Sequence, residues 1–444
     1  MIYANEFYTV QEFRSVKLKI AIVGLGKVGL PLAVFLAQKN VVIGIDIDEI
    51  VVGKVNNAIE PFPGEKGLKE LLEIAVRNKN LSATSDIGNA VSFADVIISC
   101  IPLIIDDKKA PDFENYDNLV QEIGRYIKKD VLISFETTLP VGTTRNRFTS
   151  ILEKMSGYKV GKDFSVVFSP ERISSGTFYH DLLTYPKLVG GVTDSCTVIG
   201  KKFYEVALIG NKSDSSVNKI QIIAMSNSET AEFTKIVETT YRDVNIGLAN
   251  EFTLYANRKN IDFTEVVKAA NTNPHTQMHS PGISVGGHCI PVYPYFYISD
   301  NLDSQIVQAA RSRNLSMPYI AIEKIKNTFS SIKDFNIGIF GLTYRAGVKE
   351  IAFSGSLVLR DILKENGAKV FGFDPFYSKT EIENLEFEFG DNHNILDGVI
   401  IHTDHKEYSN LDFEGFENLK FIFDGRNQIS YLKNGQNKFE YLSF

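Results

Sequence analysis

Apolar and polar positions along this chain alternate in the order expected of strands that are each followed by a helix. From Lys17, the segment KLKIAIVGLGKVGLPLAVFLAQKNVVIGIDID contains an apolar run, a glycine turn, a helical stretch and a second apolar run. Strand-like runs recur at ADVIISCIP, DVLISFET and FSVVFSPER, with helical segments such as DNLVQEIGRYIKKD between them. This alternation predicts a parallel sheet that is covered by helices on both faces.

The pattern changes beyond that segment and then returns. AMSNSETAEFTKIVETTYRDVNIGLANEFTLYANRKN keeps helical spacing without a proline, which predicts one long helix. Strand and helix patterns alternate again in FNIGIFGLTYRAGVKE, SLVLRDILKENGAKVFGFDP, DGVIIHT and KFIFDG. The expected fold is α/β, with two doubly wound Rossmann-like domains joined by a central helical segment. Its expected parts are an N-terminal extension over 1–16, a first domain over 17–215, a helical segment over 216–326 and a last domain over 327–444.

Composition and charge exclude several classes of protein. Of 444 residues, 44% are apolar and 23% charged, which is typical of a folded globular chain. The net charge of -7 gives no general attraction to nucleic acid or to an anionic membrane. No apolar run reaches the roughly 18 residues of a membrane-spanning helix, and the first 16 residues lack the apolar core of a signal peptide. We therefore expect a cytoplasmic protein with neither nucleic acid nor membrane as a partner.

The three cysteines Cys100, Cys196 and Cys289 are too few and too scattered for a disulfide framework. None belongs to a CxxC pair, so the sequence predicts no metal site.

A glycine-rich turn connects the first predicted strand to the first predicted helix. In Gly24-Leu-Gly26-Lys-Val-Gly29, the glycines permit a tight turn, the approach of a pyrophosphate and close helix packing. Asp46 ends the next strand, 17 residues after Gly29, where a carboxylate can accept hydrogen bonds from an adenosine ribose. Because that carboxylate repels a 2′-phosphate, the motif predicts NAD in preference to NADP. The alternative is a glycine turn that merely connects two elements.

Cys289 lies in SPGISVGGHCIPVYPYF, where prolines and paired glycines indicate a shaped loop. His288 is placed to lower the pKa of a neighbouring thiol. A thiolate can add to a carbonyl and form an adduct from which a hydride leaves to give a thioester. The alternative is a buried, inert cysteine, which is the expectation for Cys100 within its apolar strand.

Further candidates for a functional site are polar residues on the long predicted helix and after one predicted strand. Lys235, Thr239 and Arg242 form a polar stripe, although a solvated lysine is the simpler interpretation. Glu171 and Arg172 follow a strand end, where open parallel sheets bind ligands, but they also fit a surface pair.

The order of these segments resembles the UDP-glucose/GDP-mannose dehydrogenase family. IAIVGLGKVGLPLA, ETTLPVGTTR, SPERISSG, KIVETTYRDVNIGLANE, PGISVGGHCIPVYPYF and GLTYRAG carry the resemblance over nearly the whole chain. TYRDVNIGLANE and VGGHCIPV are most similar to the branch that acts on UDP-N-acetylhexosamines, UDP-N-acetyl-D-mannosamine above all. The resemblance implies oxidation of a sugar's primary alcohol to a carboxylate by a homodimer, with two NAD and one water, to supply a uronic acid for a surface polysaccharide.

The resemblance also implies roles for individual residues. Cys289 would be the nucleophile and Lys235 the acid/base residue, with Glu171 and Thr138 handling water and protons. Cofactor contacts would come from Gly24, Gly26, Lys27, Val28, Gly29, Asp46, Pro102 and Thr138. Substrate contacts would come from Arg172, Ile173, Lys235, Thr239, Arg242, His275 and Gly286, with Tyr344 and Arg345 holding the UDP portion.

Several positions depart from the family's pattern. Thr239 replaces an asparagine, Tyr293 an aspartate, His275 an arginine, Asn273 a histidine, Ala352 an arginine and Val51 a basic residue. A charge-assisted hydrogen bond is worth roughly 1.5–3 kcal/mol, so losing two costs on the order of a hundredfold in affinity or rate.

These departures leave three hypotheses open. The first is an NAD-dependent nucleotide-sugar 6-dehydrogenase, with UDP-N-acetylglucosamine and UDP-glucose as alternative substrates. The second is a non-catalytic paralogue that binds a nucleotide sugar, or pairs with an active homologue, as a regulatory or assembly subunit. The third is a single-hydride β-hydroxyacid dehydrogenase that relies on Lys235 alone.

Overall fold

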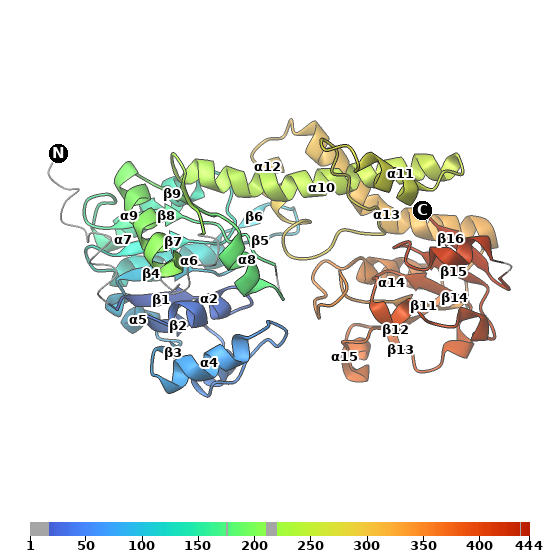
Figure 1. Cartoon of the computed structure of the whole chain (residues 1–444), viewed down its shortest axis with the longest axis horizontal. Helices are drawn as coiled ribbons and strands as arrows, with labels where there is room; N and C mark the ends of the chain where they lie inside the picture. The colour runs from blue at the N-terminus through green and yellow to red at the C-terminus, as the bar shows by residue number, and fades with distance from the viewer. Residues whose placement is uncertain (1–16, 175, 210–219, 436) are drawn as a thin grey trace. The chain divides into compact units, whose positions relative to one another are not determined.

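The computed structural model of this protein describes residues 17–174, 176–209, 220–435 and 437–444. The chain forms two compact units that divide between Val237 and Glu238, and each is considered separately below (Figure 1). The predicted extension over 1–16 and the predicted boundary at 215–216 lie outside the described residues.

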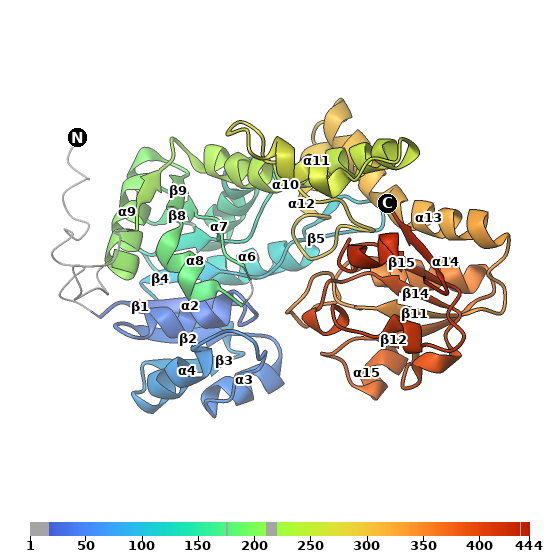
Figure 2. The same ribbon diagram turned by 45° about the vertical axis from the view of Figure 1, so that its right-hand side comes forward.

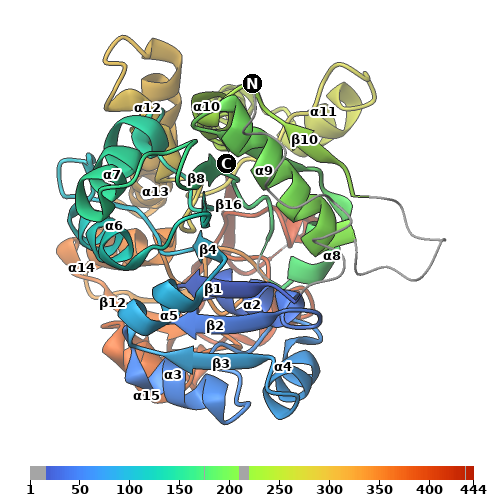
Figure 3. The same cartoon turned by 90° about the vertical axis from the view of Figure 1, so that its left-hand side faces the viewer.

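The first unit is built on an eight-stranded sheet in the order β10-β9-β8-β7-β4-β1-β2-β3. Its strands β4, β1, β2 and β3 lie in succession in Figure 3. All neighbouring strands are parallel except β8 and β9, which are antiparallel. The strands are β1 (Lys19–Val23), β2 (Val41–Ile45), β3 (Leu81–Thr84), β4 (Val96–Ser99), β7 (Leu132–Phe135), β8 (Ser165–Phe168), β9 (Lys187–Gly191) and β10 (Ile222–Ala224).

Helices follow most strands of the first unit, as the sequence pattern predicts. They are α2 (Gly29–Leu36), α3 (Glu49–Asn56), α4 (Leu68–Arg77), α5 (Ile87–Phe93), α6 (Glu114–Tyr126), η1 (Thr143–Thr149), α7 (Ser150–Ser156), α8 (Phe178–Thr184), α9 (Asp194–Tyr204) and η2 (Glu205–Ile209). A small hairpin joins β5 (Ile104–Ile105) to β6 (Pro111–Asp112). Consecutive residues of β4, β7 and β8 are all buried, because helices cover both faces of the sheet. This explains their unbroken apolar runs.

The predicted long helix is α10 (Ser228–Arg258). It is followed by α11 (Phe263–Ala270), α12 (Tyr293–Ile298) and α13 (Gln305–Phe329). Within the second unit, Asp243 of α10 forms an ion pair with Arg311 of α13 at 3.2 Å, and both side chains are almost fully buried. Asn314 Nδ2 also donates to Asp243 Oδ1, at 2.8 Å. These polar contacts fix α13 against α10.

A six-stranded, wholly parallel sheet forms the core of the second unit, in the order β13-β12-β11-β14-β15-β16. Its strands are β11 (Asn336–Phe340), β12 (Lys369–Phe373), β13 (Glu388–Phe389), β14 (Gly398–Ile401), β15 (Phe421–Asp424) and β16 (Glu440–Ser443). The helices are α14 (Gly355–Glu365), α15 (Lys379–Asn384) and the short η3 (His393–Ile395), η4 (Lys406–Tyr408), η5 (Phe413–Gly415) and η6 (Ser430–Asn434). Figure 2 labels the strands β11, β12, β14 and β15 and the helices α13 to α15.

In both units the first strand lies inside the sheet. In the first unit β1 lies between β2 and β4, and in the second unit β11 lies between β12 and β14. This reversal of strand order is the feature of doubly wound folds that opens a ligand crevice at the carboxyl ends of the strands. The predicted fold class is therefore confirmed. Among the described residues, the structure contains no helix of the length and apolarity needed to cross a membrane.

Candidate active site

The glycine turn after β1 has a shape that two of its glycines make possible. Gly24 has a φ of +89°, and its N–H donates to the Ile45 carbonyl at 2.8 Å. A Cβ on Gly29 would lie 1.8 Å from the Gly24 carbonyl oxygen. A Cβ on Gly26, by contrast, would meet no atom within 4 Å. The fold thus explains Gly24 and Gly29, while Gly26 leaves open surface that a pyrophosphate can approach.

Asp46 lies beside this turn. Its Oδ2 accepts from the Leu25 N–H at 2.8 Å, and its Oδ1 accepts from the Asp48 N–H at 3.0 Å. The sequence thus placed a carboxylate correctly at the end of β2, next to the turn. A dinucleotide fits these residues, because open backbone and a strand-end carboxylate lie at one edge of the sheet.

The other residues predicted to contact the cofactor follow strands of the same sheet. Lys27 and Pro102 are exposed, Val28 is half-buried and Thr138 is buried. The loop after β7 is held to the loop after β4, since the Thr137 hydroxyl donates to the Ile101 carbonyl. Because β1, β2, β4 and β7 are parallel, these residues share one edge of the sheet.

Glu171 and Arg172 follow β8 at the same edge. Glu171 is buried, and its carboxylate contacts the Lys187 ammonium of β9. Burial opposes its ionisation, but the charge of Lys187 and the hydrogen bonds to it hold the pKa of Glu171 below its ordinary value, and the charge of Lys235 acts in the same direction. Glu171 is therefore ionised at neutral pH. Arg172 Nη1 donates to the Pro186 carbonyl at 3.2 Å, and Ile173 packs against the apolar core.

The start of α10 places Lys235 in the first unit. One turn earlier on α10, the fully buried Glu232 carboxylate accepts from the N–H groups of Gly142 and Thr144, at 2.6 and 2.8 Å. Glu229 pairs with Arg145, whose Nη1 also donates to the Val192 carbonyl at 2.5 Å. Two carboxylates of α10 thus fix this helix to the loop and helix that follow β7. Lys235 is partly buried.

The loop that carries Cys289 belongs to the second unit. Cys289 is a free, exposed cysteine, whereas Cys100 is partly buried, with a pKa well above its ordinary value because of burial. A Cβ on Gly286 would lie 2.5 Å from Tyr344 Cβ and 3.0 Å from the Phe353 carbonyl oxygen. Gly287 has a φ of +91°, and its N–H donates to the Ala352 carbonyl at 2.8 Å. The paired glycines therefore let the cysteine loop pack directly against the segment that contains Tyr344.

Backbone groups of the same loop are held by the helices. The Gly282 N–H donates to Asn250 Oδ1 at 2.9 Å, and Asn250 Nδ2 donates to Asn314 Oδ1 at 2.9 Å. Arg311 Nη1 donates to the carbonyl of Ile290, the residue after Cys289, at 3.5 Å. His288 is directed to a carboxylate, since its Nε2 lies 3.5 Å from Glu350 Oε1.

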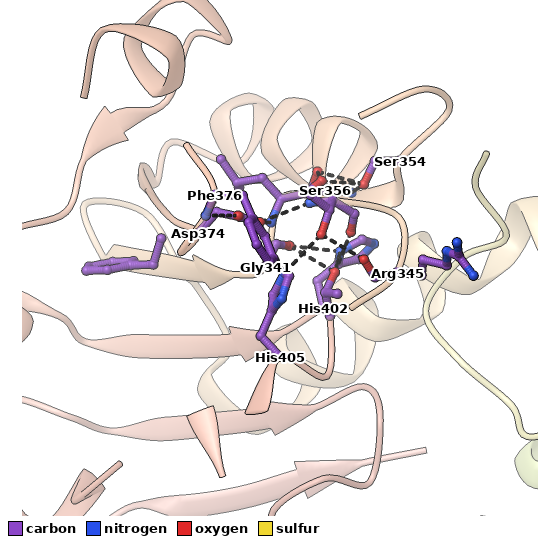
Figure 4. A network of polar contacts seen from close by, with 12 residues as sticks. Gly341, Arg345, Ser354, Ser356, Asp374, Phe376, His402 and His405 are labelled. Carbon is purple, nitrogen blue, oxygen red and sulfur yellow. Dashed lines mark hydrogen bonds and ion pairs between the residues drawn. The ribbon is translucent and has the colours of Figure 1, made fainter. Parts of the chain in front are cut away.

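The turn after β11 repeats the arrangement found after β1. Gly341 has a φ of +88°, and its N–H donates to the Phe373 carbonyl at 2.8 Å. Asp374, at the end of β12, accepts from the Leu342 N–H at 2.7 Å, and its Oδ2 lies 3.3 Å from His405 Nε2. Figure 4 shows Asp374, His402 and His405 gathered around this turn. Although burial opposes its ionisation, the hydrogen bonds and the charge of His405 hold the pKa of Asp374 below its ordinary value.

Tyr344 and Arg345 extend from this turn. The Arg345 guanidinium lies 5.9 Å from the centre of the Tyr344 ring. The Thr343 hydroxyl donates to the Arg345 carbonyl at 3.1 Å. The second unit therefore brings together three of its predicted residues, Cys289, Gly286 and Tyr344, with Arg345 next in the chain.

His402 joins the cysteine loop to the sheet. Its Nδ1 lies 2.9 Å from the Gly341 carbonyl, and its Nε2 lies 3.1 Å from Ser284 Oγ. Burial lowers the pKa of His402 to about 4. The neutral ring thus donates from Nδ1 to Gly341 and accepts the Ser284 hydroxyl at Nε2.

This neutral histidine predicts acid sensitivity. Since an unfolded histidine has an ordinary pKa of about 6.5, the unfolded chain binds a proton between pH 6.5 and 4 that the folded chain does not. The stability that His402 contributes is present above pH 6.5 and is lost as the pH falls towards 4, by on the order of 3 kcal/mol. Urea unfolding at pH 7 and pH 4.5 should show a smaller loss for His402→Gln than for the wild type. The exposed His180→Gln should behave as the wild type, and equal losses in all three proteins would contradict the assignment.

The other residues predicted to contact substrate differ in their burial. His275 is exposed, and its N–H donates to Asn273 Oδ1 at 3.0 Å. Arg242 is exposed on α10, where its charge adds to the effect of burial in lowering the pKa of His279. Thr239 is buried in α10. Lys235 belongs to the first unit and Cys289 to the second.

The structure shows the contacts of three residues that depart from the family pattern. Tyr293 begins α12, and its ring lies 5.4 Å from that of Phe296. Ala352 supports the cysteine loop through its backbone carbonyl. Val51 belongs to the apolar core of the first unit.

A cavity of about 420 Å³ lies in the second unit, near the ends of α10, β15 and β16. Its wall includes Asn257, Lys324, Arg426 and Tyr441. It is not lined by the residues that the sequence predicted to contact substrate. Among the described residues, no group of three or more His, Cys, Asp or Glu side chains is arranged to hold a metal.

Several polar residues near Glu171 and near the turn after β11 were not predicted from the sequence. Lys187 contacts both Glu136 and Glu171, and Tyr204 donates to Glu136. Asp374, His402 and His405 surround the turn after β11. Glu136 and Asp374 each directly follow an apolar strand, a signal that could have identified them as it identified Asp46. Lys187 and Tyr204 carry no such signal.

The chain is similar to known proteins over most of its length. One relative is the UDP-N-acetyl-D-mannosamine dehydrogenase of Pyrococcus horikoshii, 31% identical over 92% of this chain and 95% of that protein. Another is the UDP-N-acetyl-D-mannosamine dehydrogenase of Methanocaldococcus jannaschii, 32% identical over 90% of this chain and 89% of that protein. The solved structure of the Pyrococcus horikoshii dehydrogenase matches with a TM-score of 0.83 at 28% identity, covering 96% of this chain and 98% of that one.

Three family models match successive segments of the chain. They describe the NAD binding domain over residues 18–208, the central domain over 229–316 and the UDP binding domain over 338–431. The glycine turn with Asp46, the exposed Cys289 and the second strand-end turn lie within these three segments in that order. The chain therefore belongs to the UDP-glucose/GDP-mannose dehydrogenase family.

Proposed function

We propose that this protein is an NAD-dependent dehydrogenase that oxidises the primary alcohol of UDP-N-acetyl-D-mannosamine to a carboxylate. The observation that carries this proposal is an exposed, free Cys289 on a glycine loop packed against Tyr344. A nucleophilic cysteine allows the aldehyde stage to be oxidised further, because the adduct it forms can lose a hydride. The similarity to dehydrogenases named for UDP-N-acetyl-D-mannosamine supports the choice of sugar.

The first unit would hold the cofactor on the Gly24–Gly29 turn, with Asp46 at the adenosine ribose and Lys27, Val28, Pro102 and Thr138 along the same sheet edge. Bound NAD would supply the hydride acceptor for both oxidations. Lys235 would accept the alcohol proton and stabilise negative charge on the sugar oxygen. This role is supported by the partly buried position of Lys235, whose charge acts on Glu171.

Cys289 would attack the aldehyde carbon and become acylated in the second oxidation. Glu171 would then serve as the base for the water that releases the acid, with Thr138 in the same proton path. Tyr344 and Arg345 would bind the UDP portion, and Gly286 would keep the cysteine loop close to them. Further substrate contacts are proposed for Arg172, Ile173, Thr239, Arg242 and His275.

We also propose that the protein is a homodimer. In the second unit, α10 exposes a row of large apolar side chains along one side, namely Tyr241, Leu248, Phe252 and Tyr255. They recur at helical spacing, so they form a stripe that a second copy of the helix can cover. The three free cysteines are consistent with the reducing cytoplasm as the location.

A substrate panel tests the proposed function. Purified protein with NAD should form two NADH per molecule of UDP-N-acetyl-D-mannosamine. Its kcat/KM should be at least tenfold lower with UDP-N-acetylglucosamine or UDP-glucose. One NADH per sugar would favour a single-hydride enzyme. Calorimetric binding of UDP sugars without binding of NAD would favour a non-catalytic paralogue.

A further inference from the structure

Three ionisable side chains are buried together behind the sheet edge of the first unit. Glu136 follows β7, Glu171 follows β8 and Lys187 begins β9, and their side chains are between 0% and 8% exposed. Lys187 Nζ donates to Glu136 Oε2 at 3.1 Å and also contacts Glu171 Oε1. One ammonium therefore bridges two carboxyl groups.

The backbone and a tyrosine hold this group rigidly. The Glu171 N–H donates to the Glu136 carbonyl at 3.2 Å, and the Glu136 N–H donates to the Ser99 carbonyl at 3.0 Å. Tyr204 of α9 donates its hydroxyl proton to Glu136 Oε1, and its oxygen lies 2.7 Å from Ser134 Oγ. The Glu136 carboxyl is thus held on one oxygen by Lys187 and on the other by Tyr204.

The charges of this group balance if one carboxyl keeps a proton. Two ionised carboxylates and one ammonium would leave a net negative charge in a buried site, which is costly. Burial, opposed by Lys187 but reinforced by the charge of Glu171, raises the pKa of Glu136 to about 8. Glu171 has the lowered pKa described above. Glu136 therefore keeps the proton at neutral pH, and Glu171 carries the charge.

The other titratable groups that act on this pair come from four elements. They are Tyr204 of α9, Cys100 after β4, Tyr116 of α6 and Lys235 of α10. Burial raises the pKa of Cys100, Tyr116 and Tyr204, so these three groups are neutral. The positive charge of Lys235 favours the ionised form of Glu171.

We propose that Glu136 and Lys187 are positioning residues that keep Glu171 ionised as the base for hydrolysis, with Glu136 as the internal holder of a shared proton. The inference rests on the proposed function of Glu171. It adds two residues that touch neither the sugar nor the cofactor and that act through Glu171.

The hydrolytic step balances without a further reactant. An O–H bond of water breaks, and its proton goes to the Glu171 carboxylate. The water oxygen forms a bond with the acyl carbon, the carbon–sulfur bond breaks, and Cys289 leaves as a thiolate. With Glu136 already protonated, the buried group passes from neutral to singly positive instead of starting from a net negative charge. The acid product loses its own proton to solvent.

An infrared measurement tests the shared proton without turnover. At pH 7, the difference spectrum between the wild type and Glu136→Gln should contain the C=O band of a protonated carboxylic acid. The difference spectrum between the wild type and Glu171→Gln should contain the same band, because Glu136 then ionises as the remaining carboxyl group beside Lys187. Absence of this band from both difference spectra would overturn the proposal.

Kinetics test the positioning role. The decay rate of the acyl adduct on Cys289 can be followed by intact mass spectrometry. In the wild type, a plot of this rate against pH should have an inflection near pH 8, where Glu136 ionises. Glu136→Gln should keep the neutral-pH rate within about threefold and lose the inflection, since an amide mimics the protonated acid.

Lys187→Gln should slow the decay of the adduct at pH 7 at least a hundredfold, with partial recovery at higher pH. Lys187→Arg should restore the rate to within tenfold of the wild type. The matched control is Lys201→Gln, which alters an exposed lysine on α9 and should leave the decay unchanged.

A wild-type pH profile in Glu136→Gln would overturn the inference even if Lys187→Gln does not fold. Absence of turnover from the wild type would instead refute the proposed function. The infrared result would still decide whether the two carboxyl groups hold a proton.

Discussion

Replacement of Cys289 by alanine should abolish the second oxidation, with a loss of about a thousandfold or more in the rate of uronate formation. The loop and its glycines would remain, but no sulfur would be present to form the adduct from which the second hydride leaves. Uronate formation and the yield of NADH per sugar measure the effect. Because Cys289 is exposed, the loss of its side chain should change the free energy of unfolding little.

The matched control for this variant is Cys196→Ala. Cys196 is buried in the core of the first unit and belongs to α9. Its replacement should lower stability but leave two NADH per sugar. Full two-step turnover by Cys289→Ala would show that the second oxidation uses another route, such as the aldehyde hydrate.

Replacement of Gly26 by alanine should weaken NAD binding at least tenfold without lowering the melting temperature. The added Cβ meets no protein atom within 4 Å, so the fold accepts it. The same Cβ would occupy the surface that a pyrophosphate must approach. Calorimetric titration with NAD and a thermal melt of the same sample measure both parts of this prediction.

Two other glycines serve as controls. Gly53→Ala in α3 also adds a Cβ that meets nothing within 4 Å, so its NAD affinity should match the wild type. Gly29→Ala adds a Cβ 1.8 Å from a backbone oxygen and should lower the melting temperature as well as the affinity. Unchanged NAD affinity in Gly26→Ala would place the pyrophosphate elsewhere.

The departures from the family pattern fall into two physical classes. Ala352 contributes its backbone carbonyl to the local structure, and Val51 packs in the apolar core. The loss of the basic side chain at these two positions therefore does not disturb the local fold. Thr239 lies one helical turn after Lys235 in α10, Tyr293 begins α12 four positions after Cys289, and each changes the hydrogen-bonding groups available at its position. Activity measurements on variants of Thr239 and Tyr293 should therefore be made first.

Local patterns allowed the fold class and many candidate residues to be predicted. Apolar runs of strand length, glycine turns and a proline-free helical stretch are properties of neighbouring residues, and they identified β1, α10 and the Gly24–Gly29 turn. The family motifs added Cys289, Lys235 and Glu171. The exposure of Cys289 follows from its proline- and glycine-rich loop, which cannot pack as a regular core segment.

The sequence alone predicted the α/β class and the strand-end position of Asp46, because spacing along the chain encodes these features directly. The nucleophilic role of Cys289 stays a prediction that the family resemblance supplied. The folded chain, by contrast, was needed to show that Lys187 bridges Glu136 and Glu171 and that Ser284 contacts His402. These partners lie between 16 and 118 positions apart and are brought together by strand order and burial. Their protonation states depend on that burial, so no local pattern could have revealed them.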